Sequence, residues 1–396
     1  MKTLRNLSFL FVAGLFFAGC HSNDDEVGNW KKVESFGGMG RLGAVSFVLG
    51  ERAYVGTGIS ENARELKDFY YCTANSDKDI VWNRDTATFP GGARLGAVAF
   101  STGKVAYVGL GYSAGQHQGS TRTEEYFDDF YKYDGKTWTK VAAKFPGELR
   151  RYALGFYVPD PNNSGKGKAY VAYGQYNKGS EGSGPLKDWW EFDLETETWK
   201  EVTWTFGEKR AGACVAVIGS DAYIFTGQDG SSYPNDVIRF SPFKSEPLKF
   251  LDQLKDKDGQ SFDNDYGMIP RGYAVAFAVG KESDQSARIY LASGARGNLL
   301  ADCWEFNPYK GEKGRWDEVT SLPSFALRQA ACAFVLNDVG YIAVGGSTSV
   351  PASSSLSVKQ TTYLFEPGID DDDKFSIMNL KRGVRTSRFL FIFTRP

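Results

Sequence analysis

The sequence predicts an all-β protein, a six-bladed β-propeller with four antiparallel strands in each blade. Three positions recur six times: an arginine, a tyrosine after a small and apolar stretch, and a glycine four residues after the tyrosine. The arginines are Arg41, Arg94, Arg150, Arg210, Arg271 and Arg328. The tyrosines are Tyr54, Tyr107, Tyr170, Tyr223, Tyr290 and Tyr341, and the glycines are Gly58, Gly111, Gly174, Gly227, Gly294 and Gly345. Successive arginines lie 53 to 61 residues apart, a period that indicates a propeller or a solenoid.

Each repeat contains stretches with strand character. In the second repeat, "GAVAF" and "AYVGLG" are short apolar runs, and "DFYKY" alternates between aromatic and polar residues. An aspartate opens this third run in five repeats, at Asp68, Asp129, Asp188, Asp236 and Asp302. A tryptophan 11 or 12 residues before the next arginine marks a fourth strand, at Trp82, Trp138, Trp199 and Trp316. Four strands make one propeller blade. Between blades four and five, residues 241–270 are expected to form an insertion.

The N-terminus of the globular part is expected to close the ring. Trp30 lies 11 residues before Arg41, so "WKKV" is a fourth-type strand that no first three strands precede. The last repeat has "TTYLFEP", residues 361–367, as its third strand. We expect the N-terminal strand to complete blade six, because closure removes exposed sheet edges. The alternative fourth strand is "KFSIMNL", residues 374–380.

These repeats resemble kelch repeats over about residues 30–366. The resemblance is closest to lipoproteins of Bacteroidetes type that are described as galactose-oxidase-like or N-acetylneuraminate-epimerase-like. It implies a kelch-type propeller over residues 30–366. The C-terminal tail, residues 367–396, has no counterpart in the repeats.

The N-terminus predicts export and a lipid anchor. Lys2 and Arg5 precede an apolar run, residues 7–17, which is too short to span a bilayer and is typical of a signal peptide. Residues 17–20 resemble a lipobox, so we expect a signal peptide over residues 1–19, a lipidated Cys20 and a flexible tether over residues 20–29. The alternative is an ordinary signal peptide with a chance cysteine. The acidic residues 21–26 resemble a surface-export signal, or form a polar linker. The expected location is the outer membrane, with the protein at the cell surface or on the periplasmic face.

Composition excludes several functions. The net charge is −2 and no basic block stands out, which argues against nucleic acid as a partner. The four cysteines after Cys20 have no disulfide or zinc spacing, so we expect buried thiols. The chain has two histidines, His21 and His117, too few for the copper site of galactose oxidase. We therefore expect no metal and no cofactor, and a monomer.

Strand direction brings the arginines, the aspartates and the longest loops to one face of the propeller. The arginines could bind an anion, or each could pair with the aspartate that opens a third strand. Arg94 would then face Asp68 or Asp129. Strict periodicity favours pairing, because a ligand site is usually asymmetric. In the last repeat Thr361 replaces the aspartate, so Arg328 is the arginine expected to be free for an anion. Arg94 and Arg150 are further candidates.

Loop residues supply the remaining candidates for ligand contact. Tyr112, Tyr176 and Tyr233 could stack on a sugar or pack within the propeller, and His117 could be a base or a solvated loop residue. The acidic candidates are Glu124, Glu125 and Glu181.

Three functions remain open. The first is a non-catalytic lipoprotein that binds a glycan or peptide beside an outer-membrane uptake complex. The second is a cofactor-free sugar mutarotase resembling N-acetylneuraminate epimerase. In that reading Arg328 would hold the carboxylate and a loop glutamate would act as the base. The third is an adaptor that binds another protein through the same face.

Overall fold

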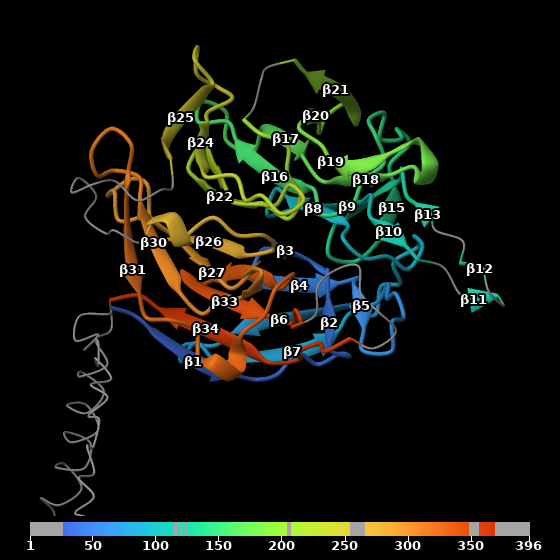
Figure 1. Cartoon of the computed structure of the whole chain (residues 1–396), viewed down its shortest axis with the longest axis horizontal. Coiled ribbons are helices and arrows are strands. Elements are labelled where there is room, and N and C mark those ends of the chain that lie inside the picture. The colour runs from blue at the N-terminus through green and yellow to red at the C-terminus, as the bar shows by residue number, and fades with distance from the viewer. Residues whose placement is uncertain are drawn as a thin grey trace, which may run out of the picture.

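The computed structural model describes residues 27–114, 117–118, 121–122, 125–203, 207–253, 266–347 and 356–368. Six four-stranded antiparallel sheets surround one centre, which confirms the predicted six-bladed propeller (Figure 1). The predicted signal peptide, Cys20 and most of the tether lie outside the described residues, as do residues 369–396 of the tail.

The first strand of each blade lies at the centre and the fourth at the periphery. Blade 1 comprises β3 (Val45–Leu49), β4 (Arg52–Gly56), β6 (Phe69–Ala74) and β7 (Ile80–Arg84). Blade 2 comprises β8 (Val98–Ser101), β9 (Ala106–Gly109), β14 (Phe130–Tyr133) and β15 (Trp138–Lys140). Blade 3 comprises β16 (Leu154–Pro159), β17 (Gly167–Ala172), β20 (Trp189–Asp193) and β21 (Thr198–Val202).

The second half of the ring repeats this pattern. Blade 4 comprises β22 (Cys214–Ile218), β23 (Asp221–Phe225), β24 (Asp236–Phe240) and β25 (Leu248–Gln253). Blade 5 comprises β26 (Val275–Val279), β27 (Arg288–Ala292), β30 (Cys303–Asn307) and β31 (Arg315–Val319). Blade 6 comprises β32 (Cys332–Leu336), β33 (Val339–Ala343), β34 (Thr362–Glu366) and β1 (Asn29–Val33). The expected insertion over residues 241–270 is therefore wrong in part, since β25 is the fourth strand of blade 4 and lacks the marker tryptophan.

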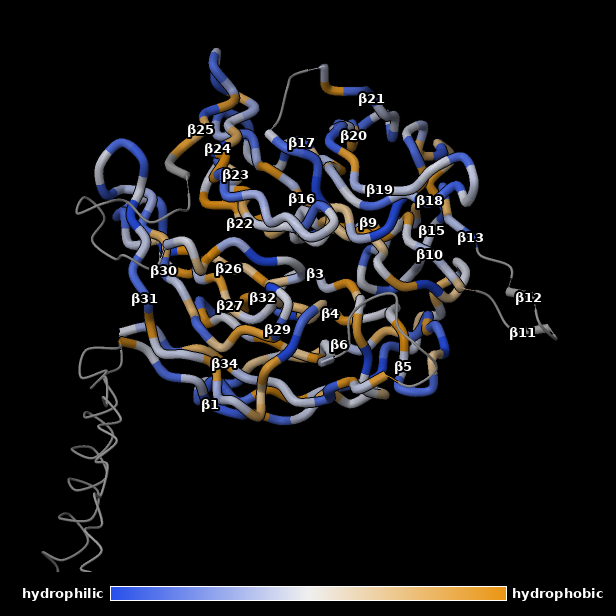
Figure 2. Tube along the Cα trace, viewed as in Figure 1, coloured by the Kyte–Doolittle hydropathy of each residue, from blue (hydrophilic) through white to orange (hydrophobic). Residues whose placement is uncertain are grey.

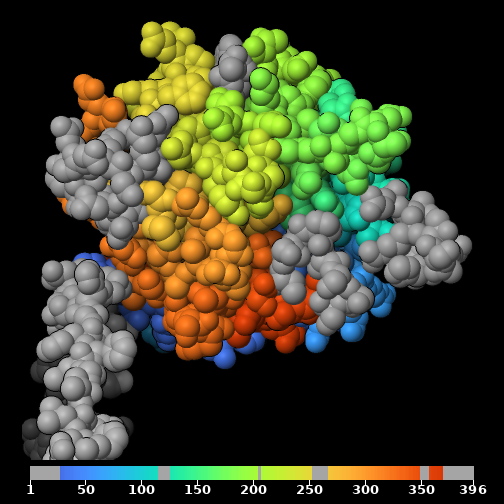
Figure 3. All heavy atoms as spheres, viewed as in Figure 1, coloured from blue at the N-terminus to red at the C-terminus, as the bar shows by residue number. Residues whose placement is uncertain are grey.

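Additional short strands form two-stranded antiparallel pairs in the connections between the blade strands. They pair β2 (Arg41–Leu42) with β5 (Ile59–Ser60), β10 (Tyr112–Ser113) with β13 (Glu125–Tyr126), β11 (His117–Gln118) with β12 (Thr121–Arg122), β18 (Gln175–Asn177) with β19 (Ser183–Pro185), and β28 (Ala295–Arg296) with β29 (Asn298–Leu299). The described helices are single 3-10 turns: η1 (Gly179–Glu181), η2 (Tyr266–Met268) and η3 (Ser324–Ala326). In the space-filling view the chain colours follow one another around the ring, so each sector of this face belongs to one blade (Figure 3).

The N-terminal strand closes the ring, as predicted. β1 pairs antiparallel with β34, so that Asn29 lies opposite Glu366 and Val33 lies opposite Thr362. The alternative strand over residues 374–380 lies outside the described residues. Because β1 takes the outer position of blade 6, the free edge of β34 is covered.

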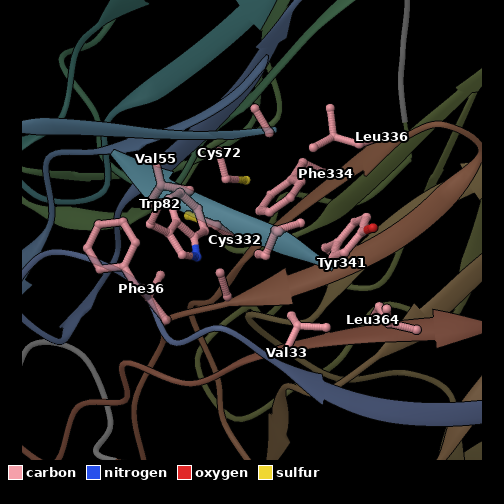
Figure 4. Packing of buried hydrophobic residues seen from close by; sticks show 14 of the residues in the cluster. Val33, Phe36, Val55, Cys72, Trp82, Cys332, Phe334, Leu336, Tyr341 and Leu364 are labelled. Atoms are coloured by element: carbon pink, nitrogen blue, oxygen red, sulfur yellow. The ribbon is translucent and has the colours of Figure 1, made fainter. Parts of the chain in front are cut away.

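The core lies mainly between neighbouring blades. Apolar residues concentrate inside the sheets, and hydrophilic residues concentrate in the peripheral turns (Figure 2). Between blades 6 and 1, Phe36 packs edge-on against Trp82, beside Cys72 and Cys332 (Figure 4). The four described cysteines are free and buried, which confirms their expected character. Their burial raises the pKa of each thiol, to about 12 for Cys332.

Two closed rings of backbone hydrogen bonds hold the blades together at the centre. The inner ring joins the residue two positions after each arginine: each of these residues donates its N–H to the carbonyl of its counterpart in the preceding blade, at 2.8–3.0 Å. Its members are Gly43, Gly96, Tyr152, Gly212, Tyr273 and Ala330, and all have positive φ, from 49° to 64°. In the second ring, each recurring glycine donates to the carbonyl of the next blade's arginine, at 2.8–3.0 Å. The repeated arginine and glycine positions thus mark the contacts between blades.

Candidate functional site

Each recurring arginine forms a structural clasp at the start of its blade. In blade 2, Arg94 donates from Nε to the Gly92 carbonyl at 2.9 Å and from Nη1 to the Leu110 carbonyl at 3.1 Å. Its Nη1 also pairs with Asp129 at 2.6 Å. The clasp therefore joins the beginnings of the first and third strands to the end of the second. This confirms that the three segments share one face, which we call the mouth.

The same clasp occurs in five blades, and each arginine pairs with the aspartate of its own blade. The pairs are Arg41–Asp68, Arg94–Asp129, Arg150–Asp188, Arg210–Asp236 and Arg271–Asp302. All the clasp arginines are 0% exposed, which confirms the structural reading. Of the two partners expected for Arg94, the structure selects Asp129.

The expectation that Arg328 is free for an anion is wrong. Arg328 is also 0% exposed, and its N–H groups donate hydrogen bonds to neutral oxygens. It donates to the Ala326 carbonyl at 2.7 Å, the Val344 carbonyl at 2.9 Å, the Thr361 carbonyl at 2.8 Å and Thr361 Oγ1 at 2.7 Å. Burial lowers the pKa of Arg328 from 12.5 to about 10, because no carboxylate compensates the lost hydration. The replacement of aspartate by Thr361 leaves a complete hydrogen-bonded clasp without its ion pair.

The three tyrosines predicted to contact a ligand lie in different environments. Tyr112 is buried at the mouth with its ring 5.1 Å from that of Tyr126. Tyr176 is half-buried on the β18–β19 hairpin. The hydroxyl of Tyr233 accepts a hydrogen bond from Gly297 N at 3.2 Å, which links the loops of blades 4 and 5.

The two described acidic candidates lie in the connections of different blades. Glu181 is exposed in η1 and Glu125 is exposed in β13. Glu124 lies outside the described residues, and His117 is described only through its backbone pairing with Arg122. The structure brings Tyr112 into contact with one of the groups described next.

The bottom of the mouth is a ring of twelve residues that we call the floor. It consists of the residue after each clasp arginine and the residue after each recurring glycine, which pair antiparallel within every blade. The first set is Leu42, Leu95, Arg151, Ala211, Gly272 and Gln329, and the second is Ile59, Tyr112, Gln175, Gln228, Ala295 and Gly346. Blades 1 and 2 contribute the apolar side chains of Leu42, Ile59 and Leu95. Blades 3, 4 and 6 contribute polar ones, so the floor is asymmetric.

Two tyrosines of the inner ring cross the centre beneath this floor. The rings of Tyr152 and Tyr273 meet edge to face, with centroids 5.1 Å apart and planes at 86°. Glycines make room for them: a Cβ on Gly43 would lie 2.9 Å from the Tyr152 hydroxyl, and one on Gly212 would lie 2.6 Å from the Tyr273 ring. The inner ring and the six alanines that follow its members line a cavity of about 130 Å³.

Arg151 is the one cation of the floor. It is 5% exposed, and its guanidinium lies over the Tyr112 ring, 4.7 Å from the centroid. Within the described part of the chain, its Nε has no hydrogen-bond partner. The neighbouring Tyr152, 9% exposed, also has a hydroxyl without a partner among the described residues. Two consecutive residues thus each have a donor without a partner among the described residues.

The repeat pattern does not single out Arg151, because this residue follows the periodic Arg150. A signal was nevertheless present, because the other repeats have Leu42, Leu95, Ala211, Gly272 and Gln329 at this position. Because five blades form with an uncharged residue at this position, the blade fold does not require the charge of Arg151.

Two further findings concern metal-ligating groups and membrane-spanning helices among the described residues. Over the described ranges, no group of three or more His, Cys, Asp or Glu side chains could hold a metal ion. No helix among the described segments is long and apolar enough to cross a membrane.

Comparison with known proteins supports the fold. No protein-family model matches the chain. N-acetylneuraminate epimerase of Shigella flexneri is 24% identical over 305 residues, which cover 69% of this chain and 77% of the epimerase. The solved structure of YjhT, a kelch propeller, superimposes with a TM-score of 0.61 at 18% identity and covers 83% of this chain and 95% of YjhT. The chain is a kelch-like six-bladed propeller.

A shorter similarity involves a larger protein. The leucine-zipper-like transcriptional regulator 1 homolog of Drosophila melanogaster is 29% identical to the kelch-like propeller over 170 residues. The alignment covers 41% of this chain and 16% of that protein. It therefore extends the similarity to a second protein only over part of the propeller.

Proposed function

We propose that this kelch-like propeller binds a glycan at the mouth and performs no reaction on it. The observation that carries the proposal is the asymmetric floor, where the Tyr112 ring stacks on Arg151, whose Nε has no hydrogen-bond partner among the described residues. Sugars offer apolar C–H faces to aromatic rings and hydroxyls to polar groups, so such a surface suits them.

The proposed place of action is the outer membrane, beside an uptake complex. The lipobox-like residues 17–20 motivate an anchor at Cys20. Mass spectrometry of the membrane-extracted chain should find a lipid on Cys20, and protease treatment of intact cells distinguishes the surface from the periplasmic face. An unmodified Cys20 in the mature protein would remove the anchor from the proposal.

Titration of the purified chain against neutral and acidic glycans by calorimetry tests ligand binding. We expect saturable binding of at least one glycan, and weaker binding after Tyr112→Ala, which removes an aromatic ring from the floor. Glu201→Ala is a matched control because Glu201 is exposed on the outer strand β21. No binding by any glycan, while short peptides do bind, would replace the glycan by a peptide ligand. A protein recovered from native membranes in fixed ratio, with no small ligand, would instead favour an adaptor.

A second candidate function is a cofactor-free sugar mutarotase. The similarity to N-acetylneuraminate epimerase over 69% of the chain favours it. Ring opening needs a positioned acid or base and a group that holds the sugar. NMR spectra of freshly released α-N-acetylneuraminate, with and without protein, measure the rate of anomerisation. An unchanged rate rejects this candidate and leaves glycan binding intact.

A further inference from the structure

Arg151 is a buried cation that the fold does not need. The five arginines that pair with aspartates join the strands of their blades, and Arg328 does so through neutral oxygens. Nε of Arg151 has no hydrogen-bond partner among the residues that the structure describes. Equivalent floor positions hold Leu42 and Leu95 in blades 1 and 2. An apolar side chain at this point is therefore compatible with a blade.

Burying a guanidinium without a partner is unfavourable, because it loses hydration and gains no equivalent contact. Stacking on Tyr112 at 4.7 Å compensates part of this loss and fixes the plane of the guanidinium. The Nε–H donor in that plane has no acceptor among the described residues. A ligand that accepts its hydrogen bond and carries negative charge would compensate the rest.

The surroundings favour an anion with one charge. The neighbouring Tyr152 hydroxyl is a second donor, and burial keeps it protonated by raising its pKa well above 10. Leu95 and Ala211 occupy the adjacent floor positions in blades 2 and 4. One cation beside apolar neighbours balances one negative charge, and the planar guanidinium matches the two oxygens of a carboxylate.

We propose that Arg151 and the Tyr152 hydroxyl form a carboxylate-binding subsite in the floor of the mouth. This inference rests on the proposed function, because it assigns one group of the ligand that the mouth would bind. The carboxylate could belong to a sugar acid or to the C-terminus of a peptide. Both sources present the same two oxygens to Arg151.

The first experiment uses the carboxylate alone. Melting temperatures of the purified chain are measured in sodium acetate and in sodium chloride at equal ionic strength, for the parent and two variants. Arg151→Leu introduces the side chain found at Leu42 and Leu95, and Glu201→Leu makes the same kind of replacement at an exposed position of the outer strand β21. We expect acetate to raise the melting temperature of the parent and of Glu201→Leu, relative to chloride, but not that of Arg151→Leu. If acetate changes the melting temperatures of the parent and of Arg151→Leu equally, the proposal of a carboxylate subsite is wrong.

The second experiment compares acids with their neutral counterparts by calorimetry. The pairs are glucuronate and glucose, N-acetylneuraminate and its methyl ester, and tripeptides with a free or amidated C-terminus. We expect the acid of at least one pair to bind the parent roughly tenfold more tightly than its neutral partner, as for loss of a charge-assisted hydrogen bond. Arg151→Leu should abolish this preference, and Arg151→Lys should restore part of it, since it keeps the charge without the planar fork.

The outcomes separate this inference from glycan binding. Glycans that bind with no preference for the acid would overturn the carboxylate subsite and keep the proposed function. An acetate effect that needs Arg151, together with no glycan binding, would overturn the proposed function and keep the subsite. Preference for the free peptide C-terminus over its amide would identify the peptide as the source.

Discussion

The clasp of blade 6 offers a direct test of the arginine network. Arg328 is the clasp arginine without a carboxylate, because Thr361 stands where the other blades have aspartate. We predict that Thr361→Asp stabilises the protein. The introduced carboxylate would lie where Thr361 Oγ1 now accepts from Arg328 Nη2 at 2.7 Å. It would replace a neutral hydrogen bond by a charge-assisted one.

The size of the gain follows from the charge of Arg328. Burial lowers the pKa of Arg328 from 12.5 to about 10. At roughly 1.4 kcal/mol per pKa unit, the lost hydration of this cation amounts to about 3 kcal/mol. The new carboxylate is itself partly dehydrated, as the 15–26% exposure of the five clasp aspartates shows. We therefore expect a net gain in the free energy of unfolding of about 1–2 kcal/mol.

The gain should depend on pH in one direction. In blade 3, burial alone would raise the pKa of Asp188, but hydrogen bonding and the charge of Arg150 outweigh burial and lower it below 3.8. A carboxylate whose pKa is lowered in the folded state stabilises the protein above its unfolded pKa of about 4. The stabilisation by Thr361→Asp should therefore be complete at pH 7 and disappear as the pH falls through the lowered pKa.

Urea unfolding at pH 7 and pH 3 measures this effect for the parent, Thr361→Asp and the uncharged control Thr361→Asn. The reverse change, Asp129→Asn, should cost about 3–5 kcal/mol, because it leaves the buried Arg94 without its ion pair. If Thr361→Asp is no more stable than Thr361→Asn at pH 7, Arg328 does not carry an uncompensated charge. A gain that persists unchanged at pH 3 would also contradict the reasoning.

Three further predictions concern the centre, the ring closure and alkaline pH. Gly96→Ala should lower the free energy of unfolding, measured in urea, by about 2–3 kcal/mol, because φ at Gly96 is 60° and a Cβ would lie 3.0 Å from Arg151 Cβ. The control is Gly103→Ala, where φ is 82° but the Cβ would point into open space. It should lower the free energy of unfolding by only about 1 kcal/mol. Deletion of residues 29–33 should expose the edge of β34 and cause aggregation in light scattering, whereas an unchanged monomer would show that β1 is dispensable. Burial raises the pKa of Tyr107 to about 12, so the folded chain keeps a proton that the unfolded chain loses near pH 10. Stability in urea should therefore fall between pH 10 and 12, and less steeply in Tyr107→Phe.

The sequence predicted the fold because its repeated residues have the same geometric task in every blade. Arg94 joins three strands of blade 2, and Gly111 bonds to the carbonyl of Arg150 in the next blade. Each blade needs the same contacts, so the residues that make them recur at regular intervals in the sequence. The fourth strand of blade 4 was harder to predict, because Leu248–Gln253 lacks the tryptophan that marks its counterparts.

The candidate site was less predictable, because contacts between separate repeats decide it. Thr361 replaces an aspartate in the sequence, yet its hydroxyl and carbonyl oxygens satisfy Arg328 in the structure. Nε of Arg151 has no hydrogen-bond partner among the described residues although Arg151 adjoins a paired arginine, because its side chain lies on Tyr112 of the preceding blade. In a repeat protein, a departure from the period therefore identifies a candidate position, and the contacts between repeats decide whether its side chain has a partner.

The two hydrogen-bonded rings also have a consequence for chain connectivity. Blades 6 and 1 are separate in the sequence, yet Gly43 donates to the Ala330 carbonyl at 3.0 Å and Gly345 donates to the Arg41 carbonyl at 2.8 Å, as at every other boundary. The junctions near the axis are therefore equivalent whether or not the polypeptide continues across them. Asn29 and Glu366 are paired neighbours, so a short linker could join them. New termini could then be opened in an exposed turn, such as the one that contains Gly165. The chain is therefore well suited to circular permutation.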